Sequence, residues 1–117
     1  MNAEKNEAFW DALDILVSSS QVVIDRTKGS HHPRFPEMVY PVDYGYLKNT
    51  KSMDGNGIDV WRGSEPSEKI DAIICTVDLM KKDSEIKILI GCMPEEKRLI
   101  LDFFNKGEYM KGLLLER

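Results

Sequence analysis

The chain opens with apolar residues at helical spacing and then changes to short runs rich in β-branched residues. Phe9, Leu13 and Leu16 recur every three or four positions, which predicts a helix over residues 4–18. A second helix is predicted over residues 94–105, because proline suits the first turn of a helix, where its missing N–H is not needed. The chain therefore has a helix near each end and a different pattern between them.

Between the two helices, β-branched and apolar residues form short segments that Gly, Asp, Asn and Ser separate, as is typical of strands joined by turns. The predicted strands are residues 21–25, 40–50, 58–62, 69–77 and 86–92. Residues 81–85 read as a charged, hairpin-like connection, and residues 112–116 either add a short strand or stay irregular. Several short strands with two flanking helices predict a mainly β fold of the α+β class, a small and mostly antiparallel barrel or sheet.

Composition narrows the classes of partner. A length of 117 residues suits one domain, so residues 1–117 are expected to form a single one. A net charge of −4 gives no overall field that attracts nucleic acid. No apolar run approaches the roughly 20 residues of a membrane helix, and residues 1–7 lack the order of a signal peptide. Cys75 and Cys92 lie far apart in apolar runs, which favours reduced core cysteines in a cytoplasmic protein over a disulfide or metal pair.

Residues 54–59, with the sequence DGNGID, place carboxylates around a tight turn. Asp59 stands at the start of the strand 58–62, close behind the turn that carries Asp54, and Asn56 lies between the two acids. Oxygen ligands of this kind can hold a hard cation such as Mg²⁺. The alternative is a simple surface hairpin turn, because Asp-Gly and Asn-Gly are common turn pairs.

Tyrosines and basic residues add candidate phosphate contacts. In an extended segment Tyr40, Val42 and Tyr44 share one face, where tyrosine hydroxyls can hold phosphate oxygens or bond at the rim of a packed core. Lys28, Arg34 and Lys87 become phosphate ligands only if they meet the acids at one mouth, and are otherwise solvated. Asp83 and Glu85 either bring a further carboxylate to that mouth or belong to a solvated hairpin tip.

Taken together, these segments resemble the soluble family I inorganic pyrophosphatases. Residues 40–45 (YPVDYG) and 54–60 (DGNGIDV) are similar to the family's Y-P-x-x-Y-G segment and its D-x-D-[PE]-x-D-x signature, in the same order. Residues 22–30 (VVIDRTKGS) resemble the family's opening V-I-E-I-P-K-G-S strand, and Lys87 resembles the lysine of its later D-x-K strand. The alignable part covers residues 21–105, and residues 21–62 carry most of its specificity.

The resemblance implies a five-stranded OB-type barrel with an N-terminal and a C-terminal helix. It implies Mg²⁺-dependent hydrolysis of pyrophosphate, a small phosphorylated substrate, by a metal-activated water at the barrel mouth. The implied catalytic residues are Asp59, Asn56 and Tyr44; the substrate contacts are Lys28, Arg34, Tyr40, Tyr44 and Lys87; the metal ligands are Asp54, Asp59, Asn56, Asp25, Asp83 and Glu85.

The chain departs from the family at several positions. Asn56 replaces the aspartate that positions and deprotonates the attacking water, and an amide carries no charge and accepts no proton at neutral pH. Gly57 replaces a proline or glutamate, and the hairpin after the K-G-S loop is nearly absent. The family's Tyr-Lys pair after the last helix has no clean match.

These departures leave a second function open. It is a catalytically degenerate relative that binds phosphate, a nucleotide or a protein through the same mouth. A third, an OB-fold module for nucleic acid, is disfavoured by the acidic balance and the lack of a basic, aromatic stripe. Trp10 and Trp61 fit either a core or the interface of a homo-oligomer.

Overall fold

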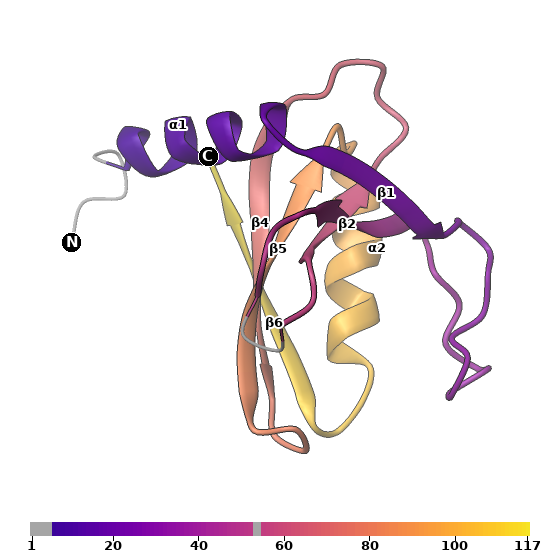
Figure 1. The fold of residues 1–117 in the computed structure, drawn as a ribbon. Helices are drawn as coiled ribbons and strands as arrows, with labels where there is room; N and C mark the ends of the chain where they lie inside the picture. The colour runs from indigo at the N-terminus through magenta and orange to yellow at the C-terminus, as the bar shows by residue number, and fades with distance from the viewer. Residues whose placement is uncertain (1–5, 53–54) are drawn as a thin grey trace.

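The periodic segments form six strands and two helices in the computed structural model of the chain, which describes residues 6–52 and 55–117 (Figure 1). The elements are α1 (Glu7–Ser18), β1 (Gln21–Arg26), β2 (Asp43–Lys48), β3 (Ile58–Arg62), β4 (Ile70–Asp78), β5 (Asp83–Ile90), α2 (Pro94–Asn105) and β6 (Met110–Glu116). The predicted bounds of β3 and α2 are confirmed. At the start of α2 the Glu96 carboxylate accepts the Met93 N–H (2.7 Å), which satisfies one of the free donors of the first turn.

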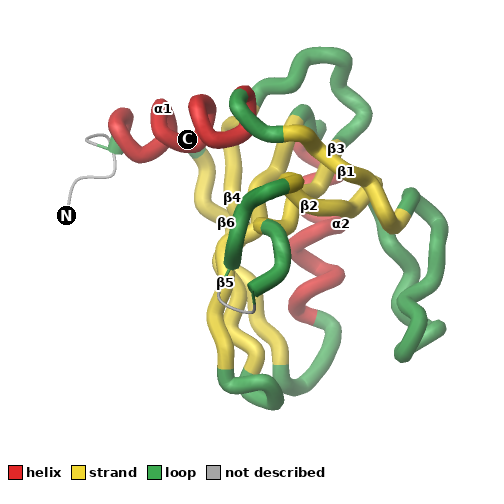
Figure 2. The backbone as a smooth tube through the Cα atoms, viewed as in Figure 1, coloured by secondary structure: helices red, strands yellow, loops and turns green. Residues whose placement is uncertain are grey.

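One sheet holds all six strands, in the order β1-β2-β3-β5-β4-β6. Figure 2 shows the strands in yellow and the two helices in red. Only the β3–β5 pair is parallel among the described strands, and the other four pairs are antiparallel. The prediction of a mainly β, OB-type fold with a helix at each end is confirmed. The sheet differs in having six strands rather than five, because residues 110–116 pair along β4, and its edges β1 and β6 are not hydrogen-bonded to each other in the described structure.

Each face of the sheet carries its own core. One core packs against α2 and contains Tyr40, Val42, Trp61, Ala72, Ile74, Leu89, Cys92, Ile100 and Phe104. The α1-face core is mainly aliphatic and contains Trp10, Leu13, Leu47, Val60, Ile70, Ile73, Ile88 and Ile90. Both tryptophans, Trp10 and Trp61, are therefore core residues rather than exposed anchors of an oligomer interface. Cys75 and Cys92 are both free.

The turn between β4 and β5 is shorter than the sequence predicts. Residues 79–82 form the turn, and Lys82 takes a positive φ of 57°, a conformation that closes tight hairpins. Asp83 and Glu85 consequently lie within β5, opposite Asp78 and Thr76 of β4, so the prediction that they belong to a connection is wrong. Their place in a strand fixes the side chain of Glu85 on one face of the sheet.

Residues 27–42 form an arm that joins β1 to β2. The arm turns back on itself with a single bridge between His31 and Val39, and projects beside the sheet on the right of Figure 1. At its base the register of β1 against β2 shifts between Ile24 and Arg26, which marks a β-bulge at Asp25. Within the part of the chain that the structure describes, neither helix is long and apolar enough to cross a membrane.

Candidate functional site

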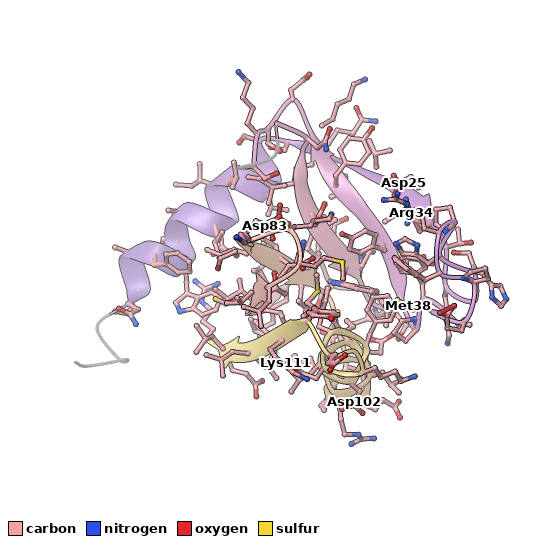
Figure 3. All side chains as sticks on the ribbon, turned by 90° about the horizontal axis from the view of Figure 1, so that it is seen from below. Asp25, Arg34, Met38, Asp83, Asp102 and Lys111 are labelled. Atoms are coloured by element: carbon pink, nitrogen blue, oxygen red, sulfur yellow. The ribbon has the colours of Figure 1, made fainter. Side chains whose placement is uncertain are left out.

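A groove of about 1070 Å³ opens between the arm, the sheet and the turn that follows α2. Eleven residues were predicted for the site, and nine of them line this groove: Asp25, Arg34, Tyr40, Tyr44, Asn56, Asp59, Asp83, Glu85 and Lys87. Viewed from below, Asp25, Arg34 and Met38 lie on the side of the arm, and Asp83 lies across from them (Figure 3). The fold therefore brings residues from distant parts of the sequence to one opening.

A buried lysine joins two carboxylates at the floor of the groove. The Lys87 ammonium donates to Asp59 Oδ2 at 2.7 Å and to Glu85 Oε1 at 2.5 Å. The side chains of Lys87, Asp59 and Glu85 are 7%, 25% and 12% exposed. We call these three residues the groove cluster. Burial by itself lowers the pKa of Lys87, but the two carboxylates outweigh burial and raise that pKa above its usual value.

Strand register explains how the groove cluster forms. The parallel pair β3–β5 places Val60 opposite Ile88, so Asp59 and Lys87 are neighbours on the other face of the same ladder. Glu85 lies two residues before Lys87 in β5 and shares that face. Side chains alternate along β3, so Trp61 belongs to the core that packs against α2 and Val60 to the core that packs against α1, and Asp59 shares the face of Trp61.

Tyr44 lies against the groove cluster. Burial raises the pKa of Tyr44, and the negative charge of the nearby Asp59 carboxylate raises the pKa further. The Tyr44 ring packs on Trp61 (4.6 Å between centroids) and on Tyr40 (5.4 Å). The hydroxyl is thus fixed by packing and stays protonated over the physiological range, where it can only act as a neutral donor or acceptor.

Arg26 is a groove residue that the sequence reasoning missed. Its Nη1 donates to the Tyr40 hydroxyl at 2.6 Å, and its guanidinium carbon lies 5.5 Å from the centre of the Tyr40 ring. In a regular strand Arg26 would share a face with Ile24, but the bulge at Asp25 turns it toward Tyr44. No simple alternation rule reveals such a bulge, so the signal was not visible in the sequence.

Two predicted residues remain, Lys28 and Asp54. Lys28 lies in the arm with an exposed side chain; its backbone N–H donates to Asp43 Oδ1 at 2.8 Å, and it is not among the residues that line the groove. Asp54 lies outside the described residues. The position of Lys28 separates it from the groove cluster, while Arg26, two residues earlier, takes a place beside Tyr40.

The departure at Gly57 has a steric reason. A Cβ at this position would lie 2.7 Å from Cδ2 of Tyr46 and 2.8 Å from the carbonyl oxygen of Leu47. Both distances are shorter than carbon atoms tolerate, so a proline or glutamate requires the strand beside it to shift. Gly57 and Asn56 both line the groove, and they bring the turn before β3 close to β2.

The groove contains the type of ligand that Mg²⁺ prefers. Every candidate ligand is an oxygen atom, and Mg²⁺ is commonly held by one or two carboxylates together with waters and substrate phosphates. Asp59 and Glu85 supply such a pair, since both contact the single ammonium of Lys87. Among the described residues, no group of three or more His, Cys, Asp or Glu side chains is placed to hold a metal ion. The donor chemistry therefore fits Mg²⁺, with two carboxylates rather than a complete protein cage.

The groove also has an acidic balance. The described lining residues include seven acidic side chains, Asp25, Glu37, Asp59, Asp78, Asp83, Glu85 and Glu108, and four basic ones, Arg26, Arg34, Lys81 and Lys87. A polyphosphate anion that enters alone meets net repulsion, whereas an anion accompanied by divalent cations meets a complementary field.

Comparison with known proteins identifies the fold. No protein-family model matches the sequence, and no curated protein matches it either. Solved structures do match: an inorganic phosphatase from Anaplasma phagocytophilum is 18% identical with a TM-score of 0.59, over 81% of this chain and 82% of that one. An inorganic pyrophosphatase from Coxiella burnetii is 16% identical with a TM-score of 0.61, over 81% and 84%. One from Helicobacter pylori is 16% identical with a TM-score of 0.60, over 84% and 85%. The chain therefore has a pyrophosphatase-like fold.

Proposed function

We propose that this protein is a Mg²⁺-dependent hydrolase that splits inorganic pyrophosphate, or a closely related phosphoanhydride, to phosphate. The observation that supports it best is the groove cluster, Lys87 with Asp59 and Glu85, next to the buried hydroxyl of Tyr44. Perturbed ionisable groups that converge in a groove are typical of catalytic sites. Their occurrence in a pyrophosphatase-like fold favours phosphoanhydride chemistry over other hydrolysis.

Each part of the groove has a role in this proposal. Asp59 and Glu85 hold the metal, with Asp54, Asn56, Asp25 and Asp83 as further candidate ligands. Lys87 and Arg34 neutralise phosphate, and the Tyr40 hydroxyl forms a hydrogen bond with it. The chemistry that Mg²⁺ supplies when bound is a lowered pKa of a bound water and charge neutralisation at the phosphate oxygens. Tyr44, which burial keeps protonated, donates a hydrogen bond to a phosphate oxygen.

Asn56 sets the expected rate. A positioned general base contributes about 10²–10⁴-fold to a rate, while enzymes accelerate reactions by roughly 10⁶-fold or more in total. The Asn56 amide accepts no proton, so this protein lacks that contribution from position 56. We therefore expect slow but genuine hydrolysis, and we place it in the cytoplasm, where free cysteines such as Cys75 and Cys92 persist.

A second candidate is a non-catalytic protein that binds a phosphorylated ligand in the same groove. The observation that favours it is that Lys87 already bonds both Asp59 and Glu85, so a metal has to share or displace a cation that is present in the chain. In that case the groove cluster would hold an anion next to Lys87 without splitting it.

Phosphate release from pyrophosphate, with and without Mg²⁺, tests the proposal. We expect release that needs Mg²⁺ and that Asp59→Ala abolishes while its circular dichroism spectrum stays folded. The matched control is Asp71→Ala, which also removes a carboxylate bonded to a lysine but lies outside the groove lining. Equal activity in wild type and Asp59→Ala, or no release from either, would contradict the hydrolase and favour the non-catalytic binding protein.

A further inference from the structure

The groove is much larger than pyrophosphate requires. Its volume of about 1070 Å³ slightly exceeds the range of roughly 300–1000 Å³ that is typical of pockets for drug-sized ligands. Pyrophosphate is a compact anion without apolar surface, and it would occupy only the charged floor around Lys87. The remaining volume calls for a ligand that has a second, larger part.

The outer part of the groove is apolar and exposed. Phe35, Met80 and Tyr109 all line it, and all three are among the exposed large apolar residues of the described chain. They come from the arm, from the β4–β5 turn and from the segment before β6, so they converge from three separate elements. Apolar side chains that gather at one opening and leave a few charged groups beneath them are characteristic of sites for organic ligands.

A continuous row of aromatic rings links the charged floor to this outer part. Tyr44 stacks on Tyr40 at 5.4 Å, Tyr40 stacks on His32 at 6.2 Å with an interplanar angle of 10°, and His32 contacts Phe35 at 5.3 Å. The row begins beside Asp59 and ends on the exposed ring of Phe35. A planar aromatic group of a ligand would extend this row at its outer end, because stacked and tilted ring contacts are favourable.

Two of the basic residues that line the groove are bonded to members of this row. Arg26 bonds the Tyr40 hydroxyl at 2.6 Å, and the backbone of Arg34 bonds His32 Nδ1 at 3.1 Å. Both arginines line the groove, and a guanidinium suits phosphate because it can form two parallel hydrogen bonds. The guanidinium groups of Arg26 and Arg34 are therefore available to bind phosphate groups between the groove cluster and Phe35.

We infer that the groove takes a nucleoside diphosphate, with the phosphates near Lys87 and Arg26 and the base stacked on Phe35. This inference rests on the proposed function and specifies its substrate class. In the reaction, water adds to the terminal phosphorus and the bond from that phosphorus to the bridging oxygen breaks. The products are a nucleoside monophosphate, phosphate and a proton.

Calorimetric titration of the purified protein with ADP and with pyrophosphate, both with Mg²⁺, tests the inference. The decisive variant is Phe35→Leu, which keeps an apolar side chain but removes the ring. Stacking of a base on an aromatic side chain is strong enough that its loss weakens ADP binding by about tenfold or more. We expect this loss for ADP and no change for pyrophosphate, and we expect Phe35→Trp to bind ADP as wild type does.

The control is Val39→Ala, an exposed apolar residue of the same arm that does not line the groove. It should leave both affinities unchanged. If Phe35→Leu binds ADP as tightly as wild type does, the inference is overturned, because the ring is then not used. Tighter binding of geranyl diphosphate than of ADP also overturns it and assigns the outer part to an alkyl tail.

The same samples separate this inference from the proposed function. Phosphate release from pyrophosphate without measurable ADP binding overturns the nucleotide inference and leaves the hydrolase standing. ADP binding that depends on the Phe35 ring, without phosphate release from either compound, supports nucleotide recognition and overturns the proposed hydrolase function. Release of phosphate from ADP that falls in Phe35→Leu supports both.

Discussion

Two buried lysines in this protein each hold two carboxylates, yet they lie in very different surroundings. Lys87 bonds Asp59 and Glu85 on the floor of the groove. Lys97 bonds Asp71 at 3.1 Å and Glu116 at 3.0 Å, and so ties α2 to β4 and β6. We call these last three residues the surface clamp. Both lysine side chains are below 10% exposed, at 7% for Lys87 and 9% for Lys97.

The difference between the two clusters lies in the carboxylates. In the surface clamp Asp71 is 31% and Glu116 is 60% exposed, so water and salt solvate that end of the pair. In the groove cluster Glu85 is only 12% exposed, and the Phe104 ring lies 5.9 Å from the Lys87 ammonium. Buried ion pairs are costly to desolvate and add little net stability compared with apolar residues. A lysine bonded to two carboxylates therefore holds elements together in the surface clamp. In the groove cluster, the same arrangement is better explained by a role in binding or catalysis than by stability.

The largest expected effect is on stability after removal of each lysine charge. Lys87→Met keeps most of the apolar stem but leaves Asp59 and Glu85 close together without their cation. Breaking a buried pair in this way costs about 3–5 kcal/mol. Lys97→Met removes a cation whose two carboxylate partners are 31% and 60% exposed, and should cost less, about 0–1 kcal/mol. Urea unfolding of the two variants beside the wild type measures both free energies.

Mg²⁺ sharpens that comparison. If Asp59 and Glu85 can hold a divalent cation, added Mg²⁺ should recover part of the stability that Lys87→Met loses and none of the loss in Lys97→Met, through preferential binding to the folded state. Equal losses in the two variants, with no response to Mg²⁺, would contradict the distinction between a functional cluster and a clamp.

The next effect is on activity and concerns Asn56. Asn56→Asp adds a carboxylate to the groove and supplies a group that can accept a proton, so Mg²⁺-dependent phosphate release should rise by about tenfold or more. Asn49→Asp makes the same change in charge at an exposed position outside the groove lining, where a positive φ of 64° suits Asn and Asp alike. The two variants are compared by initial rates at saturating Mg²⁺. An unchanged rate in Asn56→Asp would show that position 56 does not limit the reaction.

Alkaline pH gives the third prediction. Burial raises the pKa of Cys92 to about 12, and the folded-state pKa values of Tyr44 and Lys87 are also raised. A group with a raised folded-state pKa stabilises the protein fully below its unfolded pKa, and this contribution is lost as the pH rises toward the folded value. The free energy of unfolding should therefore fall above about pH 9, by up to about 1.4 kcal/mol per pH unit for each group.

Tyr44→Phe isolates the contribution of Tyr44 to the fall of the unfolding free energy with pH. The unfolded phenol ionises near pH 10, so the slope of this variant should be shallower than that of the wild type above about pH 10 and unchanged below it. Urea unfolding from about pH 8 to about pH 11, in the presence of a reductant, measures both slopes. Parallel curves for the two proteins would mean that the Tyr44 hydroxyl ionises as freely in the folded state as in the unfolded one.

Local patterns were sufficient for much of the fold. The bounds of α2 follow from Pro94 and the apolar residues after it, and the two faces of β3 follow from strict alternation. The convergence of Asp59 and Lys87 could be anticipated only through the family resemblance, because it depends on the parallel register between β3 and β5. No local rule specifies which strands become neighbours when 28 residues separate the two partners.

Two features that the sequence did not predict, the position of Arg26 and the contact between Asn105 and Gly112, arise from irregular backbone and from side-chain capping. The bulge at Asp25 moves Arg26 into the groove and could not be read from alternation. At the edge strand β6, the Asn105 amide both donates to and accepts from the backbone of Gly112 at 3.1 Å. This contact occupies the edge at Gly112 and so hinders pairing with another chain at that residue, and nothing in the pattern of residues 110–116 indicates it.

The smallest expected effect concerns salt, and it tests directly whether the two clusters differ in solvation. Raising NaCl from about 0.1 M to about 1 M shortens the screening length from about 10 Å to about 3 Å. The difference in unfolding free energy between wild type and Lys97→Met should shrink by a few tenths of a kcal/mol, because Glu116 is 60% exposed. The difference between wild type and Lys87→Met should stay the same, since buried pairs are screened much less. Urea unfolding at both salt concentrations gives the two differences, and equal shrinkage would show that the groove cluster is as well solvated as the surface clamp.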